Sequence, residues 1–242
     1  MAYLKIEKWG SRFRLLKLDG LLKKQKEYGP FSPKKEGETT STDRFENNLS
    51  RAKTRVLECG YCNDWDYFVT LTLDGSLRDR YDLPAFIKAL GAWIGNYNRK
   101  FYTKLKYVLI PEQHKDGAYH MHGLLSGVSP LSLKTNEHGF KDMPFYRERF
   151  GYISLSPLSS KDKAVSYITK YISKGFSQTE IDVGKHLYYC SQGLNKREYI
   201  QNLKVPYDFP MDFENEYCGI TWLDDAEQLE NVVLDIITHY DN

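Results

Sequence analysis

The architecture of this chain is decided by residues 106–125, which read KYVLIPEQHKDGAYHMHGLL. Two largely apolar segments, 106–112 and 119–125, flank the polar run His114-Lys115-Asp116-Gly117. An Asp-Gly pair between two such segments is a strong signal for a tight turn between paired strands. The stretch therefore predicts a β-hairpin of two antiparallel strands.

Strand and helix patterns alternate on both sides of this hairpin. Residues 67–73 (YFVTLTL) are rich in β-branched and aromatic residues and predict a strand, as do residues 152–155. Apolar residues recur at helical spacing in 43–57, 83–101 and 161–174. This order predicts an α+β fold, with a central antiparallel sheet and helices packed on one of its faces.

The two ends of the chain differ from this central region. Residues 3–8 and 12–17 alternate apolar and polar around Gly10-Ser11, which predicts an N-terminal hairpin. Residues 20–42 are rich in Lys, Gly, Pro and Ser, which is typical of a basic linker. We therefore expect a hairpin and linker over 1–42, a core domain over 43–180, and a C-terminal extension over 181–242 that packs on the core.

Charge and composition narrow the class of protein. The 242 residues carry a formal net charge of +2, too small to predict nucleic-acid binding without a further signal. Basic residues crowd the first half and acidic residues the end, which favours a polyanion-binding face on one side only. No apolar run reaches membrane-spanning length and no Gly-rich phosphate loop is present, so we expect a cytoplasmic protein without a membrane partner or NTPase activity.

The basic linker offers candidate contacts to phosphate. Lys23, Lys24 and Lys26 lie close together in it and would neutralise phosphates of a nucleic acid. A solvated linker with no ligand explains the same composition.

Two histidines of the hairpin form a candidate metal site. His120 and His122 are two apart, so their side chains project from one face of the predicted strand. If the two strands pair around the turn, Glu112 lies close to them, and His114 is the alternative third ligand. Such a set suits Mn²⁺ by affinity and Mg²⁺ by cellular abundance. The alternative is two partly exposed histidines that only contact their neighbours.

The helix predicted over 161–174 ends in YITKYISK, two successive Tyr-x-x-Lys units. Tyr167 and Tyr171 are four apart and lie one above the other on a helix. Lys170 and Lys174 each follow a tyrosine by three positions and would lower the pKa of a phenol or neutralise a phosphate, which favours attack by a phenolate. An ordinary amphipathic helix with solvated lysines is the alternative.

Taken in order, three motifs resemble those of the HUH endonuclease superfamily, specifically the rolling-circle replication initiators (Rep proteins). Residues 68–74 (FVTLTLD) resemble the first motif, a core strand, and residues 111–125 resemble the second, the metal-binding hairpin. Residues 167–174 resemble the third, the nucleophile helix. The doubled tyrosine is similar to that of two-tyrosine initiators from small single-stranded DNA phages and some plasmids.

The resemblance implies a fold, a site and a reaction. The fold would be the HUH endonuclease sheet, which is similar to ferredoxin-like and RRM-like sheets. His120, His122 and Glu112 would hold a divalent metal ion (Mn²⁺ or Mg²⁺), and Tyr167 or Tyr171 would attack single-stranded or hairpin origin DNA. The products would be a 5′-phosphotyrosyl link and a free 3′-hydroxyl for polymerase, with host helicase and polymerase as partners in the cytoplasm of a bacterial host.

Two other functions fit part of the same pattern. A transposase or relaxase of the same superfamily would share the chemistry of the site. A non-catalytic single-stranded nucleic-acid-binding module would share the sheet and use its aromatic residues for binding, without metal and without a covalent adduct.

Overall fold

The chain forms two compact units in the computed structural model, Met1–Thr39 with Asn195–Asn242, and Thr40–Leu194. The residues described are 2–18, 41–136, 139, 141–174, 186–215 and 218–240. The predicted basic linker, with Lys23, Lys24 and Lys26, lies outside them. None of the helices in the described ranges combines the length and apolar character needed to cross a membrane.

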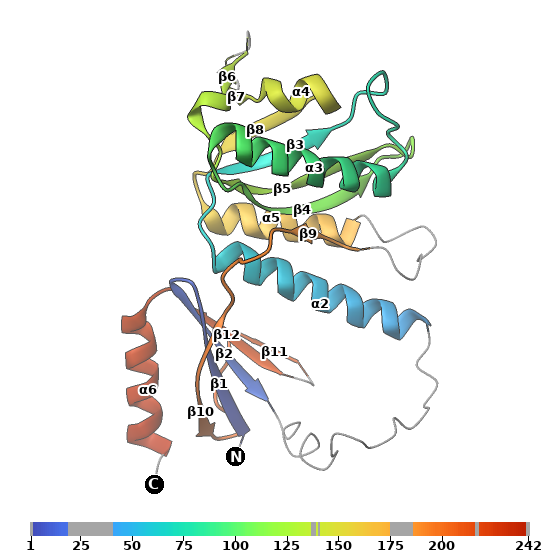
Figure 1. Ribbon diagram of the computed structural model, residues 1–242. Coiled ribbons are helices and arrows are strands. Elements are labelled where there is room, and N and C mark those ends of the chain that lie inside the picture. Colours follow the sequence, from blue (N-terminus) through green and yellow to red (C-terminus); the bar gives the residue numbers. More distant parts are fainter. Residues whose placement is uncertain are drawn as a thin grey trace, which may run out of the picture. The chain divides into compact units, whose positions relative to one another are not determined.

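The unit Thr40–Leu194 is built on an antiparallel seven-stranded sheet in the order β6-β7-β8-β3-β5-β4-β9 (Figure 1). Its strands are β3 (Tyr67–Thr72), β4 (Lys106–Gln113), β5 (Tyr119–Ser126), β6 (Lys134–Thr135), β7 (Lys141–Asp142), β8 (Ile153–Pro157) and β9 (Tyr189–Cys190). Its helices are α2 (Ser41–Tyr61), α3 (Leu83–Phe101), α4 (Pro144–Phe150) and α5 (Lys161–Lys174), with a short 3₁₀ turn at Pro130–Ser132. The predicted α+β class and the predicted central hairpin are confirmed.

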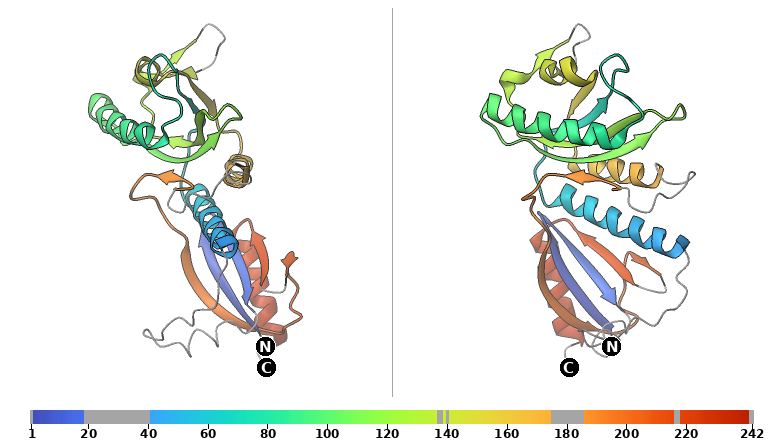
Figure 2. Two further views of the ribbon diagram at one scale, coloured as in Figure 1. Left: turned by 90° about the vertical axis from the view of Figure 1, so that its right-hand side faces the viewer. Right: turned by 45° about the vertical axis from the view of Figure 1, so that its right-hand side comes forward.

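Helices cover both faces of this sheet, which corrects the prediction that they pack on one face. Figures 1 and 2 show α3 on one side of the sheet and α5 on the other. The reason lies in β4, where Val108, Leu109 and Ile110 are consecutive and all buried. Because successive strand residues point to opposite faces, an unbroken apolar run requires a cover on each side.

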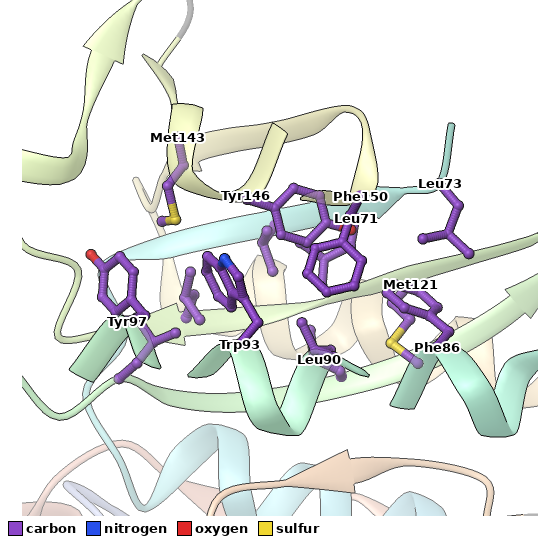
Figure 3. Close-up of a cluster of buried hydrophobic side chains, with 14 of the residues drawn as sticks. Leu71, Leu73, Phe86, Leu90, Trp93, Tyr97, Met121, Met143, Tyr146 and Phe150 are labelled. Carbon is purple, nitrogen blue, oxygen red and sulfur yellow. The ribbon is translucent and has the colours of Figure 1, made fainter. Parts of the chain in front are cut away.

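The core under α3 and α4 is strongly aromatic (Figure 3). Trp93 packs against Tyr97 and Tyr146, with ring centroids 5.2 and 5.5 Å away, and its indole nitrogen donates to the Phe145 carbonyl at 2.9 Å. Met121 of β5 is fully buried in the same cluster. Its neighbours in sequence, His120 and His122, therefore project from the opposite face of the sheet, towards α5.

The core on the α5 side depends on a close approach of two helices. Val165 and Ile168 of α5 are fully buried against Val56 of α2 and the apolar side chains of β4 and β5. A Cβ atom built on Gly60 of α2 would lie 2.6 Å from a Val165 methyl carbon. Glycine at this position therefore lets α2 and α5 come together, and α5 is the helix that carries both predicted nucleophiles.

The other unit joins the two ends of the chain in one five-stranded sheet, ordered β10-β1-β2-β12-β11. Its elements are β1 (Ala2–Trp9), β2 (Arg12–Leu18), β10 (Glu198–Val205), β11 (Phe213–Glu214), β12 (Gly219–Leu223) and α6 (Ala226–Tyr240). The predicted N-terminal hairpin is confirmed. The pairing of β1 with β10 was not predicted, and the boundaries expected at residues 42 and 180 stay predictions.

Two buried charges stabilise this terminal sheet. Glu7 is 1% exposed and accepts hydrogen bonds from Trp9 and Arg14 at 3.2 and 3.0 Å, and an ion pair with Lys5 at 2.7 Å. Burial opposes the ionisation of Glu7, but the Lys5 and Arg14 contacts prevail, so the pKa of Glu7 lies below its ordinary value. The buried ammonium of Lys17 donates to backbone carbonyls at 2.7 and 3.0 Å.

We expect Gly60→Ala to lower the free energy of unfolding by about 1–3 kcal/mol, since the added methyl group overpacks the α2–α5 contact at Val165. Chemical denaturation followed by circular dichroism measures the change. The double variant Gly60→Ala/Val165→Ala is the control, because it removes the two methyl groups that the new Cβ meets. Its cost should be smaller than the sum of the single costs, and strict additivity would contradict the contact.

Candidate active site

Three adjacent strands bring the predicted ligands to one face of the sheet. β5 lies between β4 and β3, so each of its residues has a neighbour on both sides. His120 lies opposite Glu112 of β4 and Thr72 of β3, and His122 lies opposite Thr70 of β3. Directly paired residues of antiparallel strands share a face, so these five side chains stand in a compact patch facing α5.

The carboxylate of Glu112 is in direct contact with one of the histidines. Its Oε2 atom lies 2.8 Å from Nε2 of His122, and both side chains are largely buried. His114, the alternative third ligand, instead stacks its ring on that of His120, with centroids 3.9 Å apart and planes 16° apart. Both candidates therefore lie at the site, and Glu112 is the one in contact with His122.

The histidines are also held from the side of β3. Thr70 Oγ1 lies 3.1 Å from Nδ1 of His122, and Thr72 Oγ1 lies 3.0 Å from Nδ1 of His120. Sequence reasoning did not assign these threonines. The available signal was their spacing, because two hydroxyls two residues apart in one strand match two histidines two residues apart in another.

The chemistry of these side chains suits a divalent ion. Two imidazoles and a carboxylate are common ligands of Mn²⁺ and related ions, and both imidazoles have their Nδ1 atoms engaged, which leaves Nε2 as the atom available for a ligand bond. Within the described ranges, no three His, Cys, Asp or Glu side chains already converge on one point. The set is thus a pair in contact, His122 and Glu112, with His120 beside it on the same face.

Helix α5 places both tyrosines at this patch. The ring of Tyr171 stacks on that of His122, with centroids 4.1 Å and planes 13° apart, and Tyr171 is only 8% exposed. Its hydroxyl donates to the hydroxyl of Tyr167 at 2.8 Å. Tyr167 is 49% exposed and packs against Phe68 of β3, with ring centroids 5.4 Å apart. The two tyrosines, near equivalents in the sequence, have different environments in the fold.

Burial perturbs the titration of two groups here. Desolvation, with the positive charges of His114, His122 and Arg80, holds the pKa of His120 below its ordinary value. Burial, the hydrogen bond to Tyr167 and the charge of Glu112 raise the pKa of Tyr171. In the metal-free protein His120 therefore favours the neutral form that a metal ligand requires.

The predicted lysines are only partly placed. Lys170 lies on the exposed side of α5. Lys174 is the last residue of α5, and its side chain lies outside the described residues, as does Gly175, the predicted helix stop. The roles expected for Lys170 and Lys174 stay predictions.

The comparison with known families bears on this part of the chain. Residues 66–176 match a family model described as a replication-associated protein of the ORF2 type. The matched range contains β3, the β4–β5 hairpin and α5, the elements that build the candidate site. The match supports a replication-initiator role and implies DNA binding. No curated protein and no solved structure matches the chain.

We expect the imidazole of His120 to titrate below 6.5 in the metal-free protein, because burial and the neighbouring positive charges disfavour its protonated form. NMR of the imidazole protons over a pH series measures the midpoint. His114→Gln removes one of those charges and should raise the midpoint, whereas the control His186→Gln should leave it unchanged. A midpoint at or above 6.5 in the unaltered protein would contradict this account.

Proposed function

We propose that this protein initiates rolling-circle replication by nicking and rejoining single-stranded origin DNA with a tyrosine nucleophile. The observation that carries the proposal is the contact of Tyr171 with both Tyr167 and His122, the latter in contact with Glu112. This arrangement joins a candidate nucleophile pair to candidate metal ligands on one sheet face. It lies within the range that matches the replication-associated family.

A divalent ion would be held by His120, His122 and Glu112, and Mn²⁺ or Mg²⁺ suits these ligands. When bound, it supplies positive charge that polarises a phosphoryl oxygen of the scissile group. The protein's own contribution is to hold that phosphate beside the tyrosines and to keep the imidazoles neutral. Lys170, on the same helix as the tyrosines, would neutralise further phosphate charge.

The reaction exchanges one phosphate ester for another. A tyrosine oxygen, having lost its proton to solvent, attacks phosphorus and forms the new P–O bond. The bond from phosphorus to the 3′-oxygen breaks, and that oxygen takes up a proton to become a free 3′-hydroxyl. The DNA stays attached through a 5′-phosphotyrosyl link, so a later attack by a 3′-hydroxyl reverses the step and needs no ATP.

The two environments support a division of labour in which Tyr167 attacks first. Its exposed oxygen is accessible to a bound strand, and it accepts a hydrogen bond from Tyr171, which stabilises a phenolate at Tyr167. Tyr171 is buried against His122 and would act in the second cleavage, at the junction regenerated after one round of synthesis.

The tyrosine assignment predicts a covalent protein–DNA adduct. Labelled single-stranded oligonucleotides tiled across the DNA around the gene, incubated with the protein and Mn²⁺, should yield an adduct on a denaturing gel. Tyr167→Phe/Tyr171→Phe should abolish it, and peptide mapping after a single turnover should find the DNA on Tyr167.

Tyr152→Phe, which alters an exposed tyrosine in the same unit, is the matched control and should leave the adduct unchanged. Adduct in the double variant would refute the nucleophile assignment, and oligonucleotide binding with no adduct in the unaltered protein would favour a non-catalytic module. First-turnover DNA on Tyr171 would reverse the order of attack alone.

The metal assignment predicts that cleavage is lost in EDTA and restored by Mn²⁺. His120→Ala and His122→Ala should abolish it, because each removes a candidate ligand. Calorimetric titration with Mn²⁺ compares the two alternatives for the third ligand: Glu112→Gln should weaken binding more than His114→Gln does. Undiminished cleavage in EDTA would exclude the metal role, and a larger effect of His114→Gln would make His114 the third ligand.

A further inference from the structure

We infer that Thr70 and Thr72 are positioning residues that hold His122 and His120 with Nε2 directed to the metal ion. The inference rests on the metal role in the proposed function and assigns a task to the strand β3, whose threonines touch no proposed ligand atom. Both bonds have ordinary hydrogen-bond lengths, 3.1 Å for Thr70 to His122 and 3.0 Å for Thr72 to His120.

The arrangement is repeated, which argues against an incidental contact. Thr70 and His122 are directly paired across β3 and β5, and Thr72 and His120 are the next pair on the same face. Each bond joins the same atoms, a threonine Oγ1 and a histidine Nδ1. Threonine is stiff at χ1 because it is β-branched, so each hydroxyl is held at a fixed place beside its imidazole.

A hydroxyl suits this position because it can both donate and accept. In neutral imidazole one ring nitrogen carries the proton and the other accepts. When Nε2 of His122 binds an ion, its proton must be on Nδ1, which then donates to Thr70. When Nε2–H instead faces the Glu112 carboxylate, at 2.8 Å, the Thr70 hydroxyl can donate to Nδ1. The same threonine thus supports the metal-free and the metal-bound forms.

The cost of losing the hydroxyls follows from their surroundings. Both threonines are half-buried in the sheet face that α5 covers. Replacing one with a residue of the same shape but without a hydroxyl would leave Nδ1 without that partner. Outer partners of metal-bound histidines typically contribute about 10- to 100-fold to metal affinity.

The test is calorimetric titration of the metal-free protein with Mn²⁺ alone. Thr70→Val and Thr72→Val keep the shape and remove the hydroxyl, so each should weaken Mn²⁺ binding about 10- to 100-fold. Thr70→Ser and Thr72→Ser keep the hydroxyl and should restore most of the affinity. Ser154→Ala is the matched control, because Ser154 of β8 lies opposite Thr70 on the same face, and it should bind Mn²⁺ as the unaltered protein does.

A second measurement covers the case in which a valine variant fails to fold. Nitrogen-15 NMR of the unaltered protein loaded with Zn²⁺ should show the imidazole proton on Nδ1 of both histidines. A proton on Nε2 there, or equal Mn²⁺ affinity in folded valine variants, would overturn the inference. An unaltered protein that binds no Mn²⁺ would overturn the metal role and with it this inference, whereas normal Mn²⁺ binding without any DNA adduct would overturn the nucleophile assignment alone.

Discussion

The antiparallel pairing of β5 with β4 on one side and β3 on the other is the constraint on which the candidate site depends. It sets Glu112 and Thr72 beside His120, and Thr70 beside His122. A slip of one residue would turn every side chain of β5 to the other face, exchanging the histidines with Met121. Met121 is fully buried in the aromatic core under α3, so the hydrophobic effect opposes that slip. The core on one face thereby fixes the register of the polar residues on the other.

The second requirement is that α5 lies close enough to the sheet for its tyrosines to reach the histidines. Val165 and Ile168 bury one side of α5, and Gly60 allows α2 to press against it. Tyr171 is carried onto the ring of His122 as a result, and Tyr167 is carried to the rim of the patch. Apolar packing therefore creates the asymmetry between two residues with the same local sequence context.

The sequence predicted a large part of this arrangement because the patterns that specify it are local. The period of β3, the turn between β4 and β5 and the helical repeat of α5 are each contained in a short stretch, and all three elements are observed with bounds close to those expected. The sequence did not predict a sheet covered on both faces, although the consecutive apolar residues of β4 were the available signal. Nor did it predict that β1 pairs with β10, since a pairing between strands so far apart leaves no mark on either strand alone.

The sequence by itself determined that two histidines share a strand face, that two tyrosines share a helix face, and that a carboxylate stands near the turn of the intervening hairpin. Only the tertiary structure decided that these faces meet, that Glu112 contacts His122 while His114 stacks on His120, and that two threonines of β3 hold the imidazoles. The physical reason is that side-chain direction follows from the period of a strand or helix. Contact between elements depends instead on the long-range packing that brings them together.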